Sequence, residues 1–572
     1  MDTLGIDGLL VPHDDEYLNE YTPPQLERLL WATGFSGSAG SLIVMPDTAV
    51  LFIDGRYTEQ ARLETPADLF DYEDLRALPP WQWLRDNPGR VTKLGYWSKL
   101  HSQDEIAHIE SIHHVDLVAL DEHPIDKCWT DRPNGRMPAP YPHRVEFSGE
   151  ASRSKRRRVG QELAKVGADA IVFANPNATA WLLNIRGADV PHTPVALCRS
   201  ILHANGKAAA FFAGHEISGE LREHLGPDVE ISDEEHFGDY LRALGAEGAS
   251  VLVNTAVCPR YVYDALNESG ATIREGDDPL VLFRSIKNDV EVEGFRNAHV
   301  RDGVAMVKFL HWLENSWAAG VTEIEAVKKL ESFRAEDVAL QDISFDTISG
   351  SGPNGAIIHY RVSEASNRQL GNGELFLVDS GAQYLDGTTD ITRTIALGKQ
   401  DAERRDRFTR VLQGHIALAS ARFPPDTSGN QLDLLARQPL WNAGLDYAHG
   451  TGHGVGAYLG VHEGPQSVAK KAPHVPLQAG MILSNEPGYY VEGAYGIRIE
   501  NLVVVRESAL PGMLEFETLT LAPIDRSLVD TSLMSEAELT WLNDYHARVY
   551  DQLAPLVPDA EAEWLGKVTE PL

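Results

Sequence analysis

The chain has 572 residues, of which 43% are hydrophobic and 23% are charged, and its formal net charge is −34 at pH 7. This length exceeds the size at which one hydrophobic core stops growing, and the composition excludes a disordered or fibrous protein, so we expect two to four globular domains. The negative charge repels phosphate backbones and anionic lipid surfaces, which argues against nucleic acid or a membrane as the main partner.

Two regions in the first half of the chain have similar patterns. The first contains Trp31 and the stretch TGFSGSAGSLIVMPDTAVLFIDGRY, and the second contains Trp181 and LLNIRGADVPHTPVALCRSILHANGKAAAFF. Each pattern predicts a helix end, a glycine turn and then strands joined by a polar hairpin. We therefore predict a weak duplication of one α/β unit.

A proline-rich stretch separates these regions. Residues 124–142 contain five prolines and little apolar periodicity, which is typical of a connector. A second boundary is predicted at Asp277-Asp278-Pro279. Between the two boundaries, the basic run at residues 154–158 is followed by a helical pattern and predicts a solvated helix face rather than a binding patch.

The cysteines and the N-terminus indicate where the protein resides. Cys128, Cys198 and Cys258 are far apart and match no zinc or redox spacing, which fits a reducing compartment. The first residues lack a basic n-region and an apolar h-region, and no run approaches the ~18 apolar residues of a membrane span. We therefore expect a cytoplasmic protein.

The patterns that carry chemistry begin after residue 286. Residues 290–313 have apolar positions three and four apart, which predicts a helix. The stretch FLVDSGAQYLDGTTDITRTI, residues 376–395, predicts two strands around a glycine turn. Hairpin arms lie ~5 Å apart, so Asp379 and Asp390 can converge on one point. Taken alone, Asp379 could equally cap the turn while Asp390 is exposed to solvent.

A glycine-rich loop, His449-Gly-Thr-Gly-His453-Gly-Val-Gly456, follows this hairpin. Glycines on both sides of His453 remove side-chain bulk and permit the close approach of a backbone or a ligand. A single histidine is usually structural. Two histidines in such a loop, followed by His462, favour a functional site.

Two further carboxylates follow the loop. Asn485-Glu486-Pro487-Gly488 places Glu486 at a turn, and residues 496–502 predict a strand in which Arg498 and Glu500 share a face. Arg498 and Glu500 could also be a plain ion pair. Beyond residue 510 the pattern is helical again, with Ser535 and Glu538 in capping-box spacing.

Five of these residues together form a donor set for metal ions: Asp379, Asp390, His453, Glu486 and Glu500. Carboxylate oxygens with one imidazole suit divalent manganese, cobalt, iron or zinc. Four carboxylates balance the charge of two divalent ions, so we predict a dinuclear centre. Such a centre lowers the pKa of a shared water and polarises a carbonyl, which is the chemistry of amide hydrolysis.

At these residues the chain resembles the pita-bread-fold dinuclear metallopeptidases, and among them the long, three-domain Xaa-Pro aminopeptidases (aminopeptidase P). The matching stretches are IIHY (357–360), LVDSGAQYLDGTTDITRT (377–394), HGTGHGVGAYLGVHEGP (449–465), NEPGYYVEGAYGIRIEN (485–501), DGRYTEQA (54–61), DKCWTDRP (126–133) and FETLTLAPID (516–525). The resemblance implies an α/β (α+β) chain with two related creatinase-type N-terminal domains and a pita-bread catalytic domain. We expect the domains at residues 1–125, 140–285 and 286–510, with a family extension at 511–572 packed on the catalytic domain. The helix that usually precedes the strand at residues 8–12 is expected to be short or absent, which raises the question of a misplaced start codon.

The resemblance also implies how the donor set is used. Asp379 would chelate one metal ion, Asp390 and Glu500 would bridge the pair, and His453 and Glu486 would complete the other shell. Glu486 would in addition accept a proton from the bridging water.

Four more residues receive roles from the resemblance. His359 would steady the substrate or the tetrahedral intermediate, with His462 as a hydrogen-bond donor beside it. His449 would line the pocket for proline, and Arg498, grouped with it as substrate-binding, would orient the carboxylates that hold the metal ions.

The implied activity is hydrolysis of the bond between an N-terminal residue and a penultimate proline by a metal-activated hydroxide. The cofactors would be two divalent ions, best matched by Mn2+. The partners would be peptides with proline in second place and a second copy of the chain in a homodimer, with neither nucleic acid nor membrane. Two alternatives are a prolidase-like Xaa-Pro dipeptidase, which the duplicated N-terminal region disfavours, and a non-catalytic peptide-binding module, which the intact donor set disfavours.

Overall fold

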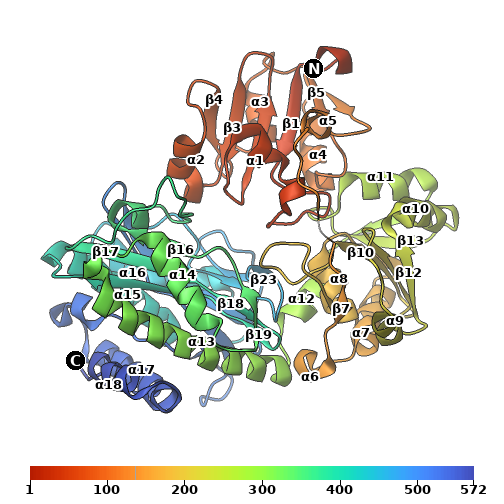
Figure 1. Cartoon of the computed structure of the whole chain (residues 1–572). Coiled ribbons are helices and arrows are strands. Elements are labelled where there is room, and N and C mark those ends of the chain that lie inside the picture. Colours follow the sequence, from red (N-terminus) through yellow and green to blue (C-terminus); the bar gives the residue numbers. More distant parts are fainter. Residues whose placement is uncertain (136) are drawn as a thin grey trace. The chain divides into compact units, whose positions relative to one another are not determined.

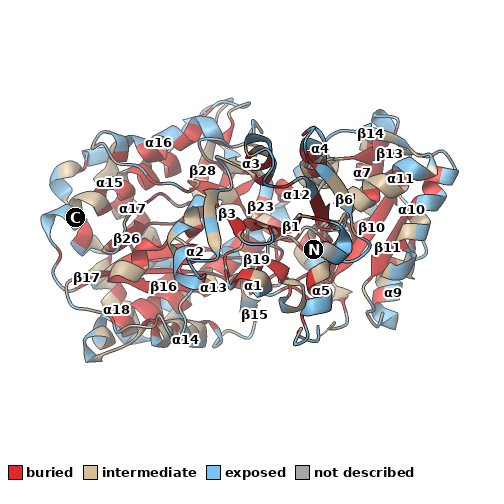
Figure 2. Cartoon of the chain, turned by 90° about the horizontal axis from the view of Figure 1, so that it is seen from above, coloured by how far each residue is buried: buried red, intermediate tan, exposed pale blue. Residues whose placement is uncertain are grey.

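The structure is a computed structural model and describes residues 1–135 and 137–572. The chain forms two compact units, residues 1–145 with 150–281 and residues 146–149 with 282–572. Both units combine β-sheets with covering helices (Figure 1), which confirms the predicted α/β class. Buried residues gather on the strands inside each unit, and exposed residues lie on outer helix faces and loops (Figure 2).

The first unit contains two six-stranded sheets that repeat one topology. The strands of the first sheet are β1 (Gly8–Pro12), β2 (Gly40–Val44), β3 (Ala49–Ile53), β4 (Phe70–Asp74), β5 (Lys93–Tyr96) and β6 (Asp116–Ala119). Those of the second are β8 (Ala170–Phe173), β10 (Cys198–His203), β11 (Ala208–Phe212), β12 (Val229–Asp233), β13 (Ser250–Val253) and β14 (Thr272–Glu275). Their orders are β4-β3-β2-β1-β5-β6 and β12-β11-β10-β8-β13-β14, with parallel and antiparallel pairs at corresponding places. The predicted duplication is thereby confirmed.

Helices cover both faces of these sheets because side chains alternate along a strand. The helices are α1 (Arg28–Thr33), α2 (Thr58–Glu64), α3 (Pro80–Asp86), α4 (Gln103–Glu110), α5 (Pro124–Cys128), α7 (Ser152–Lys165), α8 (Pro176–Leu183), α9 (Gly219–Leu225), α10 (Phe237–Ala246) and α11 (Arg260–Ser269). In β1, Leu10 belongs to an apolar cluster with Trp83 of α3, whereas Leu9 belongs to a different cluster with Leu29 of α1.

The basic run at residues 154–158 lies on α7, but the predicted solvated face is wrong for two of its residues. Lys155 and Arg156 are buried. The Nζ atom of Lys155 lies 4.3 Å from the ring centre of Trp181 and donates a hydrogen bond to Oδ1 of Asn184 (2.8 Å). The burial arises because the long apolar stems of these side chains pack against the core while oxygen acceptors reach their cationic ends.

The stretch at residues 124–142, predicted to be a connector, begins with a helix. Pro124 is the first residue of α5, where the missing N–H of proline leaves no hydrogen bond unmade. Ile125 and Trp129 then pack into an apolar cluster of the first sheet. The high proline content of the stretch favoured the prediction of a connector and gave no sign of this helix.

The second unit contains several small sheets and one six-stranded sheet. The strands are β15 (Leu340–Ile343), β16 (Ile348–Ser351), β17 (Glu374–Ser380), β18 (Ala382–Tyr384), β19 (Gly387–Thr388), β20 (Ile391–Leu397), β21 (Arg422–Phe423), β22 (Gly452–Gly454), β23 (Glu463–Val468), β24 (Ile482–Asn485), β25 (Gly488–Val491), β26 (Tyr495–Arg498), β27 (Asn501–Glu507) and β28 (Leu514–Thr518). The sheets are β16-β17-β20, β15-β18-β19, β25-β26 and β21-β28-β27-β24-β22-β23. The helices are α13 (Asp289–Ser316), α14 (Glu323–Arg334), α15 (Ala402–Ala419), α16 (Gly429–Trp441), α17 (Glu536–Leu553) and α18 (Asp559–Val568).

Helix α13 confirms the helix predicted at residues 290–313. It begins at a capping box in which Asn288 and Glu291 satisfy each other's backbone N–H groups. Met306, Phe309, Leu310 and Leu313 of this helix belong to one apolar cluster with residues of α14 and with Phe376 and Val378 of β17. Because side chains alternate along β17, Asp379 lies on the opposite face, away from these helices.

The stretch at residues 376–395 forms the two predicted strands, β17 and β20, but not the predicted simple turn between them. The strands pair antiparallel with Asp379 opposite Thr392. The connection folds into a second hairpin, β18 and β19, and β18 also pairs with β15. This partner lies far upstream in the sequence, so the local pattern could not reveal the pairing.

The continuous strand predicted at residues 496–502 is wrong. Strand β26 ends at Arg498 and β27 begins at Asn501, so Glu500 lies in the break between them. Its backbone N–H donates to the carbonyl oxygen of Thr392 (3.1 Å). This hydrogen bond holds the break against β20.

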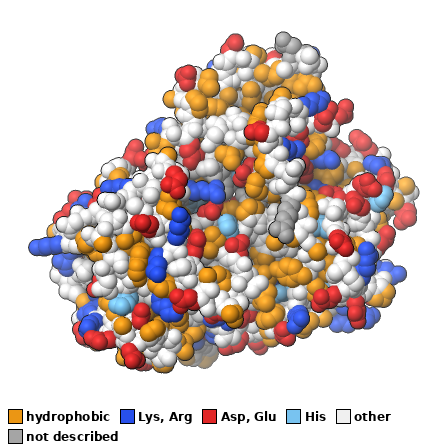
Figure 3. All heavy atoms as spheres, in the orientation of Figure 1, with side chains coloured by type: hydrophobic (Ala, Val, Ile, Leu, Met, Phe, Trp, Pro, Cys, Tyr) orange, Lys and Arg blue, Asp and Glu red, His pale blue; other side chains and the backbone are white. Residues whose placement is uncertain are grey.

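The C-terminal segment is helical as predicted, and α17 begins at a capping box formed by Ser535 and Glu538. None of the helices described over residues 1–135 and 137–572 combines the length and apolarity needed to cross a bilayer. On the face shown in Figure 3, acidic and basic side chains are interspersed.

Candidate metal centre

Strands β17 and β20 supply the two aspartates of the predicted donor set. Asp379 lies near the end of β17, and Asp390 immediately precedes β20. The Oδ2 atom of Asp379 accepts a hydrogen bond from Nη2 of Arg498 (2.6 Å). Its Oδ1 atom is buried and has no hydrogen-bond partner among the described residues. One oxygen of this carboxylate therefore remains available for a ligand.

The six-stranded sheet supplies the other three donors. His453 lies in β22, Glu486 follows β24, and Glu500 precedes β27. Strands β24 and β27 pair antiparallel with Asn485 opposite Asn501, which brings Glu486 and Glu500 to the same end of the sheet.

The donor atoms converge on one place. One ligand atom from each of Asp390, His453 and Glu500 lies within 4.8 Å of the other two. The Nε2 atom of His453 is 3.4 Å from Oδ2 of Asp390 and 3.6 Å from Oε1 of Glu486. Asp379 is close enough for its charge to act on both Asp390 and Glu500.

The local electrostatics are those of carboxylates that need a cation. Burial raises the pKa of Asp390 to about 6, and the charges of Asp379 and Glu486 add to this effect against the hydrogen bond from His453. Burial also raises the pKa of Glu500 well above its ordinary value, with the neighbouring carboxylates acting in the same direction. Buried like charges at this range are stable together only when positive charge lies among them.

The pKa of His453 is also raised, which for a histidine favours the charged form. Burial lowers its pKa, but the hydrogen bond with Asp390 and the charges of Glu486 and Asp390 outweigh burial and raise the pKa to about 9. Its Nδ1 atom lies 2.9 Å from the carbonyl oxygen of Gly454 and donates to it. This bond leaves Nε2 directed at the carboxylates, as a histidine ligand requires.

The glycines beside His453 are required by close backbone contacts. A Cβ atom on Gly452 would lie 2.0 Å from the carbonyl oxygen of Ser484, and one on Gly454 would lie 2.3 Å from that of Glu463. The predicted reason for the glycine-rich loop, close approach on both sides of the histidine, matches these contacts.

Ser484 links His453 to Glu486. Its hydroxyl accepts a hydrogen bond from the backbone N–H of His453 (2.9 Å) and donates to Oε1 of Glu486 (3.1 Å). One side chain thereby fixes the relative positions of two donors.

Two of the remaining predicted residues lie beside the donor set. The ring centroid of His462 is 4.3 Å from that of His453, at an interplanar angle of 80°. His449 interacts through Nε2 with the hydroxyl of Tyr490 (2.9 Å), which accepts a hydrogen bond from Nη1 of Arg498 (2.7 Å). His449 is thus connected to Asp379 through Tyr490 and Arg498.

His359 lies in the segment that follows residues 352–356. The carbonyl oxygen of Ile358 accepts a hydrogen bond from Nη1 of Arg498 (3.2 Å). This contact brings the His359 segment beside the guanidinium that orients Asp379.

The sequence patterns did not single out Thr392, Ser484 or Tyr490, although all three contact predicted residues. The hydroxyl of Thr392 donates to Oε2 of Glu500 (2.7 Å) and accepts from Nε of Arg498 (3.1 Å). A signal for Thr392 was present, because Thr392 lies two positions after Asp390 in extended chain, and residues two apart share a face.

Family models match almost the whole chain. "Metallopeptidase family M24" matches residues 293–507, and "Creatinase/Prolidase N-terminal domain" matches both 1–122 and 131–291. "C-terminal region of peptidase_M24" matches residues 512–572.

Named relatives align over nearly their full lengths. The probable Xaa-Pro aminopeptidase P of Laccaria bicolor is 38% identical, over 99% of this chain and 91% of the relative. Aminopeptidase P2 of Arabidopsis thaliana is 37% identical, over 100% of this chain and 86% of the relative. A similar solved structure is that of X-prolyl aminopeptidase from Caenorhabditis elegans, described as a cytosolic enzyme with a di-nuclear active site. It superposes with a TM-score of 0.94 at 32% identity, and the match covers 99% of this chain and 95% of the other. This chain belongs to the aminopeptidase P group of metallopeptidase family M24.

Proposed function

We propose that the protein is a metal-dependent aminopeptidase that hydrolyses the bond between an N-terminal residue and a penultimate proline. The observation that carries the proposal is the convergence of Asp390, His453 and Glu500 within 4.8 Å, with the free Oδ1 of Asp379 nearby. The named aminopeptidase P relatives, aligned along the whole chain, support the same activity.

Two divalent metal ions are the proposed cofactors. Asp379 would hold one ion, Asp390 and Glu500 would bridge the pair, and His453 and Glu486 would complete the other ligand shell. When bound, the two ions would lower the pKa of a shared water and polarise the scissile carbonyl. Oxygen-rich donors with one imidazole suit Mn2+, which we propose as the working metal.

Glu486 is the proposed proton carrier. Its side chain is 18% exposed, so it remains in reach of water and substrate. Ser484 holds Oε1 by a hydrogen bond, which leaves Oε2 to take the proton of the attacking water and deliver it to the proline nitrogen as the bond breaks. Proton delivery is needed because this nitrogen leaves as a secondary amine.

Three histidines are proposed to act on the substrate. We assign His462 and His359 to hydrogen bonding with the reacting carbonyl group, and His449 to the pocket for proline, where Tyr490 fixes its ring. A dedicated pocket is needed because the proline amide has no N–H and a fixed φ angle, so an enzyme that recognises an ordinary peptide N–H would not bind it.

The alternative activity is prolidase-like cleavage of dipeptides only. The Xaa-Pro dipeptidase of Bacillus anthracis aligns with 65% of this chain at 23% identity and a TM-score of 0.53, a likeness that concerns the fold alone. The two activities differ in how they treat a longer peptide: an aminopeptidase cleaves Xaa-Pro-Yaa-Zaa, whereas a dipeptidase leaves it intact.

A quenched fluorescent Xaa-Pro-Pro peptide tests the proposal. We expect cleavage after the first residue, loss of activity after chelation and restoration by Mn2+, with an Xaa-Ala-Pro peptide as the matched control substrate. Metal content of the purified protein separates this enzyme from a peptide-binding module, which would carry no stoichiometric transition metal. Cleavage of Xaa-Pro with no cleavage of longer peptides would transfer the assignment to the dipeptidase.

Three further properties complete the proposal. We propose the division into domains at residues 1–125, 140–285, 286–510 and 511–572, a cytoplasmic location and a homodimer. The location is supported by three free cysteines and by the cytosolic relative from Caenorhabditis elegans. Light scattering of the purified protein tests the homodimer.

A further inference from the structure

Arg393 carries a buried positive charge directly behind the metal centre. It follows Thr392 in β20 and is among the most deeply buried large side chains. Its Nη1 atom donates to the backbone carbonyl oxygens of Glu500 (2.7 Å) and Thr392 (2.9 Å). These two hydrogen bonds fix the backbone of Glu500, a proposed metal ligand, and the backbone of Thr392. The hydroxyl of Thr392 in turn donates to the carboxylate of Glu500.

Every hydrogen-bond acceptor recorded for this guanidinium in the described part of the chain is a neutral oxygen. Besides Thr392 and Glu500, the acceptors are the backbone oxygens of Ala522 (2.8 Å) and Pro523 (3.0 Å), Oδ1 of Asn501 (2.8 Å) and the hydroxyl of Tyr545 (2.9 Å). Burial lowers the pKa of Arg393, which reflects the cost of holding its charge here. A buried cation satisfied by neutral oxygens depends on all of them being in place.

Tyr545 comes from α17 in the C-terminal segment, far from β20 in the sequence. Its hydroxyl accepts the hydrogen bond from Arg393 and lies 2.9 Å from the carbonyl oxygen of Ala522, to which it can donate. Its ring stacks on Trp541 of the same helix, with centroids 5.4 Å apart and an interplanar angle of 8°. The ring position is therefore set by packing, and the hydroxyl is the polar link to the centre.

The hydrogen-bond network of Arg393 continues towards Glu486. Asn501 accepts from Arg393 through Oδ1, and its Nδ2 donates to Nε2 of His415 (3.1 Å). His415 must then carry its proton on Nδ1, which lies 3.1 Å from the carbonyl oxygen of Asn485. The Nδ2 atom of Asn485 donates a hydrogen bond to the backbone oxygen of His415 (2.9 Å). Burial lowers the pKa of His415 to about 3, in keeping with this neutral tautomer.

The ends of this network are the immediate neighbours of two proposed ligands, since Asn485 precedes Glu486 and Asn501 follows Glu500. We propose that Tyr545 is a positioning residue that, through Arg393, Asn501 and His415, sets the spacing of Glu486 and Glu500 for the metal pair. The C-terminal segment is thereby a working part of the catalytic centre. This inference rests on the proposed metal-dependent function.

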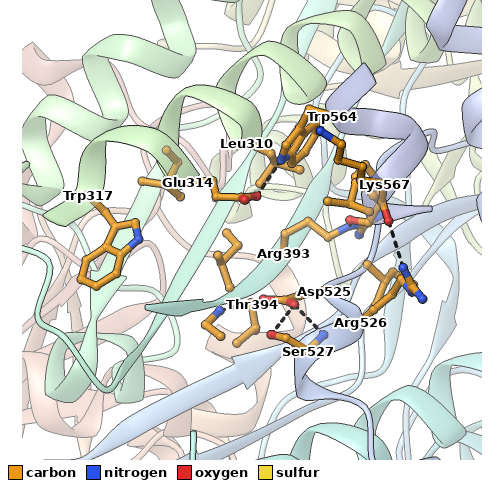
Figure 4. A pocket seen from close by; sticks show the side chains of 16 residues that line it. Leu310, Glu314, Trp317, Arg393, Thr394, Asp525, Arg526, Ser527, Trp564 and Lys567 are labelled. Carbon is orange, nitrogen blue, oxygen red and sulfur yellow. Dashed lines mark hydrogen bonds between the residues drawn. The ribbon is translucent and has the colours of Figure 1, made fainter. Parts of the chain in front are cut away.

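Packing alone does not fix this side of β20. A cavity of about 380 Å³ lies between α13, β20, residues 523–527 and α18 (Figure 4), and Arg393 is among the residues that line it. The side chains of β20 that face this pocket lack close-packed neighbours there. The hydrogen bonds of Arg393 therefore carry more of the positioning than they would beside a filled core.

Tyr545→Phe tests the inference because it removes one hydroxyl and keeps the stacked ring. We expect the dissociation constant for Mn2+, measured by competition with a fluorescent chelator in the absence of peptide, to rise about tenfold, the lower end of the range for residues that support metal ligands. Tyr550→Phe is the matched control, since Tyr550 lies on the same helix with 39% of its surface exposed, and its metal affinity should equal that of the wild type.

A double-mutant cycle separates positioning from mere stability. If Tyr545 and His415 act in one network, the combined effect of Tyr545→Phe and His415→Gln on metal affinity should be clearly smaller than the product of the single effects. A lower thermal midpoint with unchanged metal affinity in Tyr545→Phe would overturn the inference and assign the hydroxyl to stability alone. Peptide cleavage is measured separately, so a wild type that binds two ions but cleaves no prolyl peptide would refute the proposed activity and leave the positioning result standing.

Discussion

The guanidinium of Arg498 holds one oxygen of Asp379 at 2.6 Å, while the other oxygen of that carboxylate is buried and has no hydrogen-bond partner within residues 1–135 and 137–572. The same guanidinium donates to Thr392 and Tyr490. With its hydrogen bond to the carbonyl oxygen of Ile358, Arg498 makes four contacts through one planar group and so fixes the direction of the free Asp379 oxygen.

Replacing Arg498 with lysine tests this arrangement. Lysine keeps the charge but cannot reach all these partners from one plane, so we expect kcat/KM to fall about 10-fold to 100-fold. Arg506→Lys is the matched control, because Arg506 lies on the surface and pairs with Glu515. Equal activity of the Arg498→Lys and Arg506→Lys variants would show that orientation by Arg498 is unimportant.

Asp390→Asn should abolish activity and metal loading. Because burial and neighbouring charges raise the pKa of Asp390, its ionised form is unfavourable in the metal-free protein. We therefore expect the metal-free variant to unfold at the same temperature as the metal-free wild type or higher, and to lose the stabilisation that Mn2+ gives the wild type. Calorimetry with and without Mn2+ measures both effects, with the exposed Asp342→Asn as control. Survival of most activity would contradict the site.

His462→Ala should lower kcat by about 100-fold or more while metal content is retained, the usual size of an acid–base or electrostatic contribution. The ring of His462 lies against that of His453, yet it is absent from the proposed ligand shell. Steady-state kinetics and metal analysis of the same sample check both parts. The exposed His474→Ala is the control, and an unchanged kcat for His462→Ala would reject the role.

His546 in α17 predicts an acid dependence of stability. Burial and the charges of Arg393 and Arg526 lower its pKa from 6.5 to about 3. A histidine with a lower pKa in the folded state gives stability above pH 6.5 that is lost as the pH falls towards 3, at about 1.4 kcal/mol per pH unit.

We therefore expect the stability difference between wild type and His546→Gln to shrink by roughly 2 kcal/mol between pH 7 and pH 5. Glutamine can still accept the hydrogen bond from the backbone N–H of Ile524. Urea unfolding at both pH values measures the difference. A gap that stays constant with pH would show that His546 does not titrate as described.

The proposed donor residues could be selected from the sequence because they lie in recognisable local patterns: a hairpin, a glycine-rich loop, a turn and a strand. Alternation along strands and glycines around His453 are local signals, and the structure brings these residues together. The break at Glu500 could not be predicted, because the hydrogen bond that holds it comes from Thr392 on another strand. Lys155 was misassigned for a similar reason, since its acceptors lie on a different element.

The link from Tyr545 to Arg393 was also beyond the sequence patterns. The sequence pattern of an amphipathic helix predicts that a tyrosine such as Tyr545 packs in the hydrophobic core. Only the folded chain shows that its hydroxyl accepts a hydrogen bond from Arg393 of β20. Long-range polar contacts of this kind leave no periodic trace, because neither partner's neighbours reveal the pairing.

The matching strand orders of the two N-terminal sheets determine how far the effect of a substitution can spread. Each sheet completes its own ladder of strand pairs and has its own apolar cluster. A substitution inside one sheet therefore leaves the strand ladder of the other sheet intact, so the two sheets can differ in side chains while they keep the same strand order.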